Sequence, residues 1–162
     1  MRPADGSGAL VIGLGNALRG DDAAGLLVAR RVRAARPELD VIEHQGEPVS
    51  LLGTWERRPS VFLVDAIGGA GTVAGTVRRF DAAASPLPVT AFGGRSTHAL
   101  SLADTIELAR TLGRLPGQVT VLGIEGEGFA LGKPPSPAVL DAVARVTAAI
   151  VAEVPRPLAA RL

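Results

Sequence analysis

The sequence VIGLGNALRGDDAAG, residues 11–25, determines how the rest of the chain is interpreted. It opens as a phosphate-binding loop does, with an apolar strand that runs into glycines and is followed by a helical pattern. Asp21 and Asp22, however, stand where a phosphate site needs a lysine or a bare helix terminus. A turn with this negative rim is better suited to a cation.

Two nucleotide-binding patterns fail on inspection of the same stretch. Gly13 and Gly15 supply the first two glycines of a dinucleotide turn, but Leu18 occupies the place of the third. The glycine spacing of a triphosphate loop is also present, but Asp21 and Asp22 follow it in place of Lys-Ser/Thr and would repel phosphates. The alternative to a cation site is that Asp21 caps the helix and Asp22 complements its dipole.

Short apolar runs alternate with helical patterns along the chain. The predicted strands are 9–12, 39–42, 61–64, 76–80 and 119–122, and the predicted helices are 23–35, 48–55, 101–112 and 136–154. Ser101 and Asp104 have the spacing of a capping box, Ser136 precedes Pro137 as an N-cap, and Trp55 is a helix-end packing residue. This alternation predicts an α/β fold with a mostly parallel sheet covered on both faces, in a single domain over residues 1–162.

Composition excludes several classes of function. The formal net charge is +1 and the charged fraction is 20%, so neither nucleic acid nor a membrane surface is an expected partner. There is no signal-peptide pattern and no membrane-length apolar run, and we expect a cytoplasmic protein, with nothing that demands more than a monomer. The absence of cysteine leaves carboxylates and histidines to hold any metal.

The candidate site follows from the rule that open α/β sheets bind ligands at the carboxyl ends of strands, where the strand order reverses. Asp65 ends the apolar run 61–64, and a buried carboxylate there needs a cation, a metal or several donors. Its alternative role is to accept backbone hydrogen bonds from the glycine loop that follows. If the first and third strands are neighbours, Asp22 and Asp65 line the same crevice.

His98 lies in the loop before the helix that starts near Ser101. A single loop histidine is commonly a solvated surface residue, but this loop also faces the predicted crevice. Two carboxylates and one imidazole form a three-point site with open positions for substrate or water. We therefore predict that Asp22, Asp65 and His98 are both the metal-binding and the catalytic residues.

Other acidic and histidine residues form weaker candidates. Glu43, His44 and Glu47 follow the second strand, where they are solvated or lie around the site. Glu125 and Glu127 lie in a glycine-rich segment that either forms a surface turn or contacts a basic part of a substrate. No serine lies in a nucleophile elbow, so a covalent hydrolase mechanism has little support.

Five segments, taken in order, resemble the hydrogenase maturation endopeptidases, which trim the C-terminal tail from the large subunit of nickel-iron hydrogenases. They are GLGNALRGDDAAG, VFLVDAIGGAGTVAGTV, STHALSL and VTVLGIEGE, followed by SPAVLDAV, and the resemblance covers roughly residues 10–154. By position, Asp22 matches the family's metal-contacting acid, Asp65 its strand-end aspartate and His98 its histidine. Asn16 matches a loop asparagine whose side chain braces the turn. Ala23, Ala74 and the segment EHQGEPVSLL depart from the family pattern.

The resemblance implies a three-layer α/β/α sandwich with a twisted five-stranded sheet. It also implies an endopeptidase that acts on a hydrogenase large-subunit precursor after nickel insertion, with the substrate's nickel, or another divalent metal such as zinc, at the three residues. Two alternatives stay open: a non-catalytic nickel-checking chaperone that binds the large subunit, and a different cytosolic hydrolase or nucleotide-binding protein on the same sheet.

Overall fold

The protein is described by a computed structural model, which defines residues 8–68, 71–92 and 100–156. Its centre is a five-stranded sheet in the order β2-β1-β3-β5-β4. The strands are β1 (Ala9–Leu14), β2 (Asp40–His44), β3 (Ser60–Ile67), β4 (Val77–Asp81) and β5 (Gln118–Glu125). All neighbouring strands are parallel except β4, which is antiparallel to β5. The predicted mostly parallel five-stranded sheet is confirmed.

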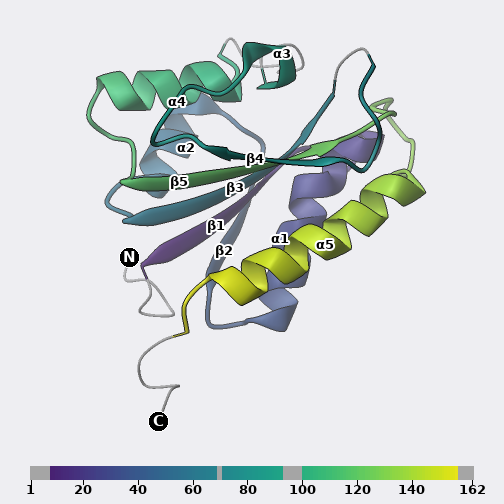
Figure 1. The fold of residues 1–162 in the computed structure, drawn as a ribbon, viewed down its shortest axis with the longest axis horizontal. Coiled ribbons are helices and arrows are strands. Elements are labelled where there is room, and N and C mark those ends of the chain that lie inside the picture. The colour runs from purple at the N-terminus through teal and green to yellow at the C-terminus, as the bar shows by residue number, and fades with distance from the viewer. Residues whose placement is uncertain (1–7, 69–70, 93–99, 157–162) are drawn as a thin grey trace.

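Helices cover both faces of the sheet, as Figure 1 shows. On one face lie α1 (Ala24–Ala35) and α5 (Pro137–Glu153), and on the other lie α2 (Pro48–Trp55), the short α3 (Val89–Phe92) and α4 (Leu102–Thr111). Alternate residues of a strand point to opposite faces, so β3 contributes Phe62 and Val64 to the first core and Leu63 and Ile67 to the second. The result is the predicted α/β/α sandwich.

Two short elements were not predicted, namely α3 and the single turn η1 (Gly20–Ala23) that precedes α1. Strands β1, β3 and β5 also continue further than their apolar runs indicate. Pairing between β3 and β5 extends to Ile67 opposite Glu125. Asp65 consequently lies inside β3, two residues before its end, rather than directly after it.

The predicted helix boundaries are confirmed in detail at α4. The Ser101 hydroxyl accepts from the Asp104 N–H at 3.2 Å, and the Asp104 carboxylate accepts from the Ser101 N–H at 3.2 Å, which completes the capping box. Trp55 is fully buried at the end of α2, where its indole N–H donates to the Arg114 carbonyl at 3.2 Å. Ser136 is the N-cap residue of α5 but makes no side-chain capping bond.

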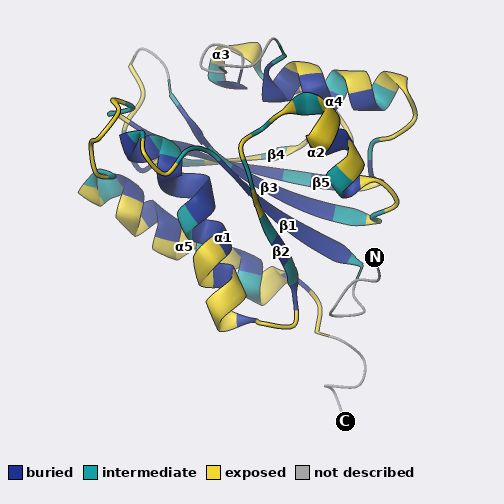
Figure 2. Cartoon of the chain, turned by 180° about the vertical axis from the view of Figure 1, so that it is seen from behind, coloured by how far each residue is buried: buried dark blue, intermediate teal, exposed yellow. Residues whose placement is uncertain are grey.

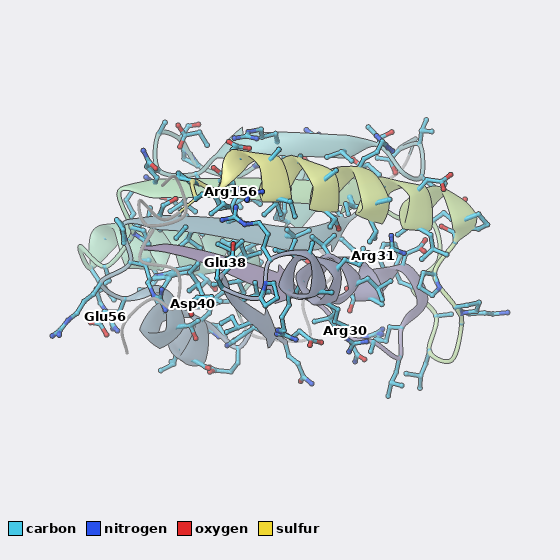
Figure 3. The ribbon with its side chains drawn as sticks, turned by 90° about the horizontal axis from the view of Figure 1, so that it is seen from below. Arg30, Arg31, Glu38, Asp40, Glu56 and Arg156 are labelled. Atoms are coloured by element: carbon cyan, nitrogen blue, oxygen red, sulfur yellow. The ribbon has the colours of Figure 1, made fainter. Side chains whose placement is uncertain are left out.

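The amino ends of the strands carry paired charges. Figure 3 shows Glu38, Asp40, Glu56 and Arg156 at this end of the molecule. Asp40 forms an ion pair with Arg58 at 2.7 Å, and both side chains are largely buried. In the described part of the chain, no helix is long and apolar enough to cross a membrane.

Candidate functional site

The strand order reverses between β1 and β3. From β1 the chain passes to β2 on one side, and it then returns to β3 on the other side. Val64 of β3 pairs with Gly13, so Asp65 follows at the level where β1 ends. The prediction that the first and third strands are neighbours is therefore confirmed, and the loop after β1 lies beside the end of β3.

A tight turn carries the chain from β1 into η1. Gly15 has a φ of 143°, and a Cβ added to it would lie 1.9 Å from the carbonyl oxygen of Asp22. The Asn16 N–H donates to that same oxygen at 3.2 Å, and the Asn16 side-chain oxygen accepts from the Leu18 N–H at 2.9 Å. Asn16 thus braces the turn, and the turn fixes the backbone of Asp22 next to the end of β1.

The start of α1 lies directly across the ends of β1 and β3. A Cβ on Gly25 would approach the carbonyl oxygens of Leu14 and Val64 to 2.2 and 2.3 Å. A Cβ on Gly13 would come within 2.1 Å of the Gly25 carbonyl oxygen. Since only glycine permits this approach, the two glycines bring η1, with Asp22, onto the end of β3.

Asp65 has the most perturbed carboxylate at this edge. Burial, as the larger effect, and the negative charge of Asp22 together raise its pKa from 3.8 to about 7, although a hydrogen bond from the backbone of Ala66 opposes both effects. The influence of Asp22 shows that the two carboxylates share one environment. Together they form a site at which a second negative charge is unfavourable unless a cation is present.

Several other carboxylates in the protein form ion pairs with arginine side chains. Asp40 pairs with Arg58, and Glu153 pairs with Arg79. Asp65 has no such ion pair within the described residues. A buried carboxylate without a counter-charge is costly, and this cost is characteristic of functional sites.

Asp21 has a structural role that the sequence did not reveal. Its side chain is fully buried and accepts from the backbone N–H groups of Glu127 at 2.8 Å, Gly128 at 3.0 Å and Ser136 at 2.6 Å. The Ser136 hydroxyl also donates to it at 3.1 Å, which explains why this serine does not cap α5. The interpretation of Asp21 as a helix cap is wrong, because its bonds reach across to the segment after β5.

These bonds also set the charge state of Asp21. Burial alone would raise the pKa of Asp21, but the hydrogen bonds from Ser136, Glu127 and Gly128 outweigh it and hold the pKa below 3.8. The carboxylate is therefore ionised throughout the physiological range. Asp21 stabilises the folded protein fully at pH values above its pKa in the unfolded chain. This stabilisation is lost as the pH falls through its lower pKa in the folded protein.

We expect Asp21→Ala to lower the free energy of unfolding by about 2–3 kcal/mol at pH 7, since it leaves several buried N–H groups without an acceptor. Thermal unfolding followed by circular dichroism should show a melting temperature lower by roughly 5–10 °C. The difference from the unsubstituted protein should begin to shrink as the pH falls below 3.8, the unfolded pKa, and should vanish once the pH is below the lower folded pKa of Asp21. An unchanged melting temperature at pH 7 would show that these bonds contribute no net stability.

The weaker candidates after β2 have local structural roles. Glu43 forms ion pairs with Arg30 and Arg33, of which the Arg30 contact is the main cause of its lowered pKa. The Glu47 carboxylate caps α2. His44 Nδ1 accepts from the Gly46 N–H at 2.8 Å, so the neutral ring carries its proton on Nε2, which lies 2.9 Å from the Ser50 hydroxyl.

The segment that contains Glu125 and Glu127 is not simply a surface turn. Glu125 is the last residue of β5, and its side chain is buried, with one carboxylate oxygen 3.7 Å from Arg78 and the other without a hydrogen-bond partner. Glu127 is exposed, and its backbone N–H binds Asp21. The sequence did not distinguish these two glutamates because β5 extends beyond its apolar run.

His98 lies outside the described residues, so the structure brings together two of the three predicted site residues. Within the described ranges, no cluster of three or more histidine, aspartate or glutamate side chains could hold a metal ion. The described part of the candidate site is therefore the carboxylate pair of Asp22 and Asp65. Hard and borderline divalent cations accept such ligands, with an imidazole as a suitable third.

Comparison with known proteins gives the family. The model of a protein family described as hydrogenase maturation protease matches residues 28–153, which are most of the chain. The chain belongs to this family. The hydrogenase maturation protease family match includes Asp65 and His98 and begins after Asp22, so the assignment of Asp22 rests on the strand order and the glycine turn. No curated protein matches the sequence.

Solved structures of maturation proteases are similar over nearly the whole chain. The protein is 26% identical to the protease HycI from Thermococcus kodakarensis, with 89% of this chain and 90% of that one covered and a TM-score of 0.68. It is 25% identical to the endopeptidase HybD from E. coli, with the same coverage of each chain and a TM-score of 0.67. An endopeptidase from Escherichia coli, also 25% identical with this coverage, gives a TM-score of 0.72. Family and fold support a protease role in hydrogenase maturation.

Proposed function

We propose that the protein is an endopeptidase that removes the C-terminal tail of a nickel-iron hydrogenase large-subunit precursor after nickel has been inserted. Membership of the maturation protease family supports the protease role. The observation that carries the proposal is the carboxylate pair at the reversal of the strand order, where burial and the charge of Asp22 raise the pKa of Asp65 to about 7. We further expect the protein to act in the cytoplasm as a monomer.

In this proposal Asp22, Asp65 and His98 contact the nickel that the precursor carries. The electrostatics of the described pair fit such a role, since a divalent cation lowers the cost of two ionised carboxylates in one partly buried site. A carboxylate with a pKa near neutrality also exchanges protons readily at physiological pH. A bound nickel or zinc ion would supply Lewis-acid polarisation of the scissile carbonyl or activation of water.

The same contacts would make cleavage depend on metal insertion. A precursor without nickel offers no cation to the carboxylate pair, and its tail is then held less firmly at the site. Positioning a peptide bond against catalytic groups supplies much of the rate of an enzymatic reaction. Metal recognition would thereby act as a check that the large subunit is loaded before its tail is removed.

We expect the purified protein to shorten a nickel-loaded large-subunit precursor and to leave the nickel-free precursor uncut. The experiment incubates both forms with the protein and measures the product masses, with the released tail identified from its own mass. Precursor treated without the protein serves as the control. Equal cleavage of both forms would show that the protein is a protease whose activity does not depend on nickel in the precursor.

The main alternative is a non-catalytic chaperone that inspects the nickel site. The same incubation separates the two functions, because a chaperone would bind the loaded precursor without shortening it. Cleavage of neither form, with binding of the loaded form, would replace the proposed endopeptidase with this alternative.

A further inference from the structure

Exposed apolar side chains gather at the edge of the sheet that holds the candidate site. Leu18 follows β1, Val49 follows β2, Val73 follows β3 and Leu131 follows β5, and all four are more than two-thirds exposed, at 68, 76, 72 and 74%. Figure 2 shows exposed loops at this end of the molecule. Apolar side chains concentrated around a site commonly mark a surface that binds a partner.

Two of these side chains lie on segments that are firmly joined. The Gly132 N–H donates to the Leu18 carbonyl at 2.8 Å, and the Asp21 N–H donates to the Gly128 carbonyl at 2.8 Å. The four bonds to the Asp21 carboxylate add to this connection. Leu18 and Leu131 are thus exposed on a fixed backbone, and a preorganised surface loses little entropy when it binds.

Positive charge accompanies these leucines. Arg19 follows Leu18, and Lys133 lies two residues after Leu131; neither side chain has an ion-pair partner among the residues that the structure describes. The two segments approach closely, because a Cβ on Gly20 would lie 3.6 Å from the Lys133 Cβ. Leu18, Arg19, Leu131 and Lys133 are called the docking ledge below.

We propose that the docking ledge binds a segment of the substrate polypeptide that carries an apolar side chain and a carboxylate group. This inference rests on the proposed endopeptidase function. Arg19 and Lys133, which have no ion-pair partner within the described ranges, select for negative charge, and the exposed leucines select for an apolar side chain. The ledge also adjoins the candidate site, since Asn16 binds the Leu18 N–H with its side chain and the Asp22 carbonyl with its own N–H.

The test measures cleavage of the nickel-loaded precursor by the double variant Leu18→Ser/Leu131→Ser. We expect KM to rise by about tenfold or more, with kcat changed less than threefold, because the ledge holds substrate away from the reacting bond. The double variant Arg19→Glu/Lys133→Glu should also raise KM. It should abolish the rise in KM that added salt causes in the unsubstituted protein, since that rise reflects screening of the ledge cations.

Leu108→Ser/Leu112→Ser is the matched control, because these leucines are exposed at the end of α4 that leads away from the site toward the amino end of β5. The control should keep the unsubstituted KM, and melting temperatures should show all variants folded. An unchanged KM in the ledge variants, or an equal rise of KM in the control, would contradict the role of the docking ledge in substrate binding. Neither result would contradict the endopeptidase function.

Two other outcomes also decide the question. Failure of the unsubstituted protein to bind or cut the precursor would reject the endopeptidase and the ledge together. A change of oligomeric state in the leucine variant, measured by light scattering without a change in KM, would assign the ledge to a second copy of the chain and overturn its role with substrate.

Discussion

Asp22→Asn should leave the protein folded and abolish tail removal from the nickel-loaded precursor. The substitution keeps the shape of the side chain but removes the negative charge that acts on Asp65 and that the proposed nickel contact requires. The loss should exceed a hundredfold in kcat/KM, about 3 kcal/mol of transition-state stabilisation, and mass spectrometry of the precursor measures it. His98→Ala should have the same effect, since it removes the proposed nitrogen ligand.

Glu127→Gln is the control for loss of a carboxylate at the same edge. Glu127 is exposed, and its described contact with the site loop is made by its backbone, which the substitution preserves. This variant should cleave at the unsubstituted rate. A fully active Asp22→Asn/His98→Ala double variant would refute the assignment of both residues.

The adjacent aspartates should therefore give opposite results. Asp21→Ala should lower stability because its carboxylate holds the segment after β5, while Asp22→Asn should remove function because its carboxylate acts on Asp65. At a temperature where the Asp21 variant is folded, its cleavage should be much closer to the unsubstituted rate than that of the Asp22 variant. Similar loss of cleavage in both would show that the turn geometry matters as much as the charge.

The difference between these neighbours also marks the limit of what the sequence could predict. The proximity of Asp22 and Asp65 was predicted on the condition that the first and third strands are neighbours, because a parallel sheet places the residues after its strands at its carboxyl edge, and β1 and β3 are neighbours. Asp21 was misinterpreted because its partners lie 106–115 residues away, in a segment without a periodic pattern. Local pattern predicts local structure, but it does not reveal a bond to a distant irregular segment.

Strand ends show the same limit. The apolar runs of β3 and β5 end at Val64 and Leu122, yet both strands continue, because each continues to pair with its neighbour. That pairing places Asp65 within a strand and buries Glu125. Helix ends were predicted more closely, since capping residues such as Ser101 act through bonds to residues only three or four positions away.

Asp65→Asn should stabilise the protein while it abolishes cleavage. In the folded protein, burial and the charge of Asp22 raise the pKa of Asp65 to about 7 from 3.8, so ionising this carboxyl at neutral pH costs folding free energy. The rise of this pKa from 3.8 to about 7 corresponds to at most ~4 kcal/mol, and partial exposure of the side chain puts the expected stabilisation by Asp65→Asn at about 2–4 kcal/mol. Thermal unfolding at pH 8 should then give a melting temperature roughly 5–10 °C above that of the unsubstituted protein.

The pH dependence distinguishes this cause from better packing. As the pH falls below 3.8, the unfolded pKa, the carboxyl becomes neutral in both the folded and the unfolded chain, so the free energies of unfolding of the two proteins should converge. The difference between these free energies should widen from this value up to about pH 7 and then stay constant. Asp141→Asn, on the exposed side of α5, controls for net charge. When Asp65→Asn is made in a protein that already carries Asp22→Asn, its stabilising effect should be smaller, because one cause of the raised pKa of Asp65 is already absent. An equal difference in melting temperature at pH 4 and pH 8 would mean that the stabilisation does not come from the loss of an ionised carboxylate. The raised pKa of Asp65 would then no longer support a cation-binding role for the carboxylate pair.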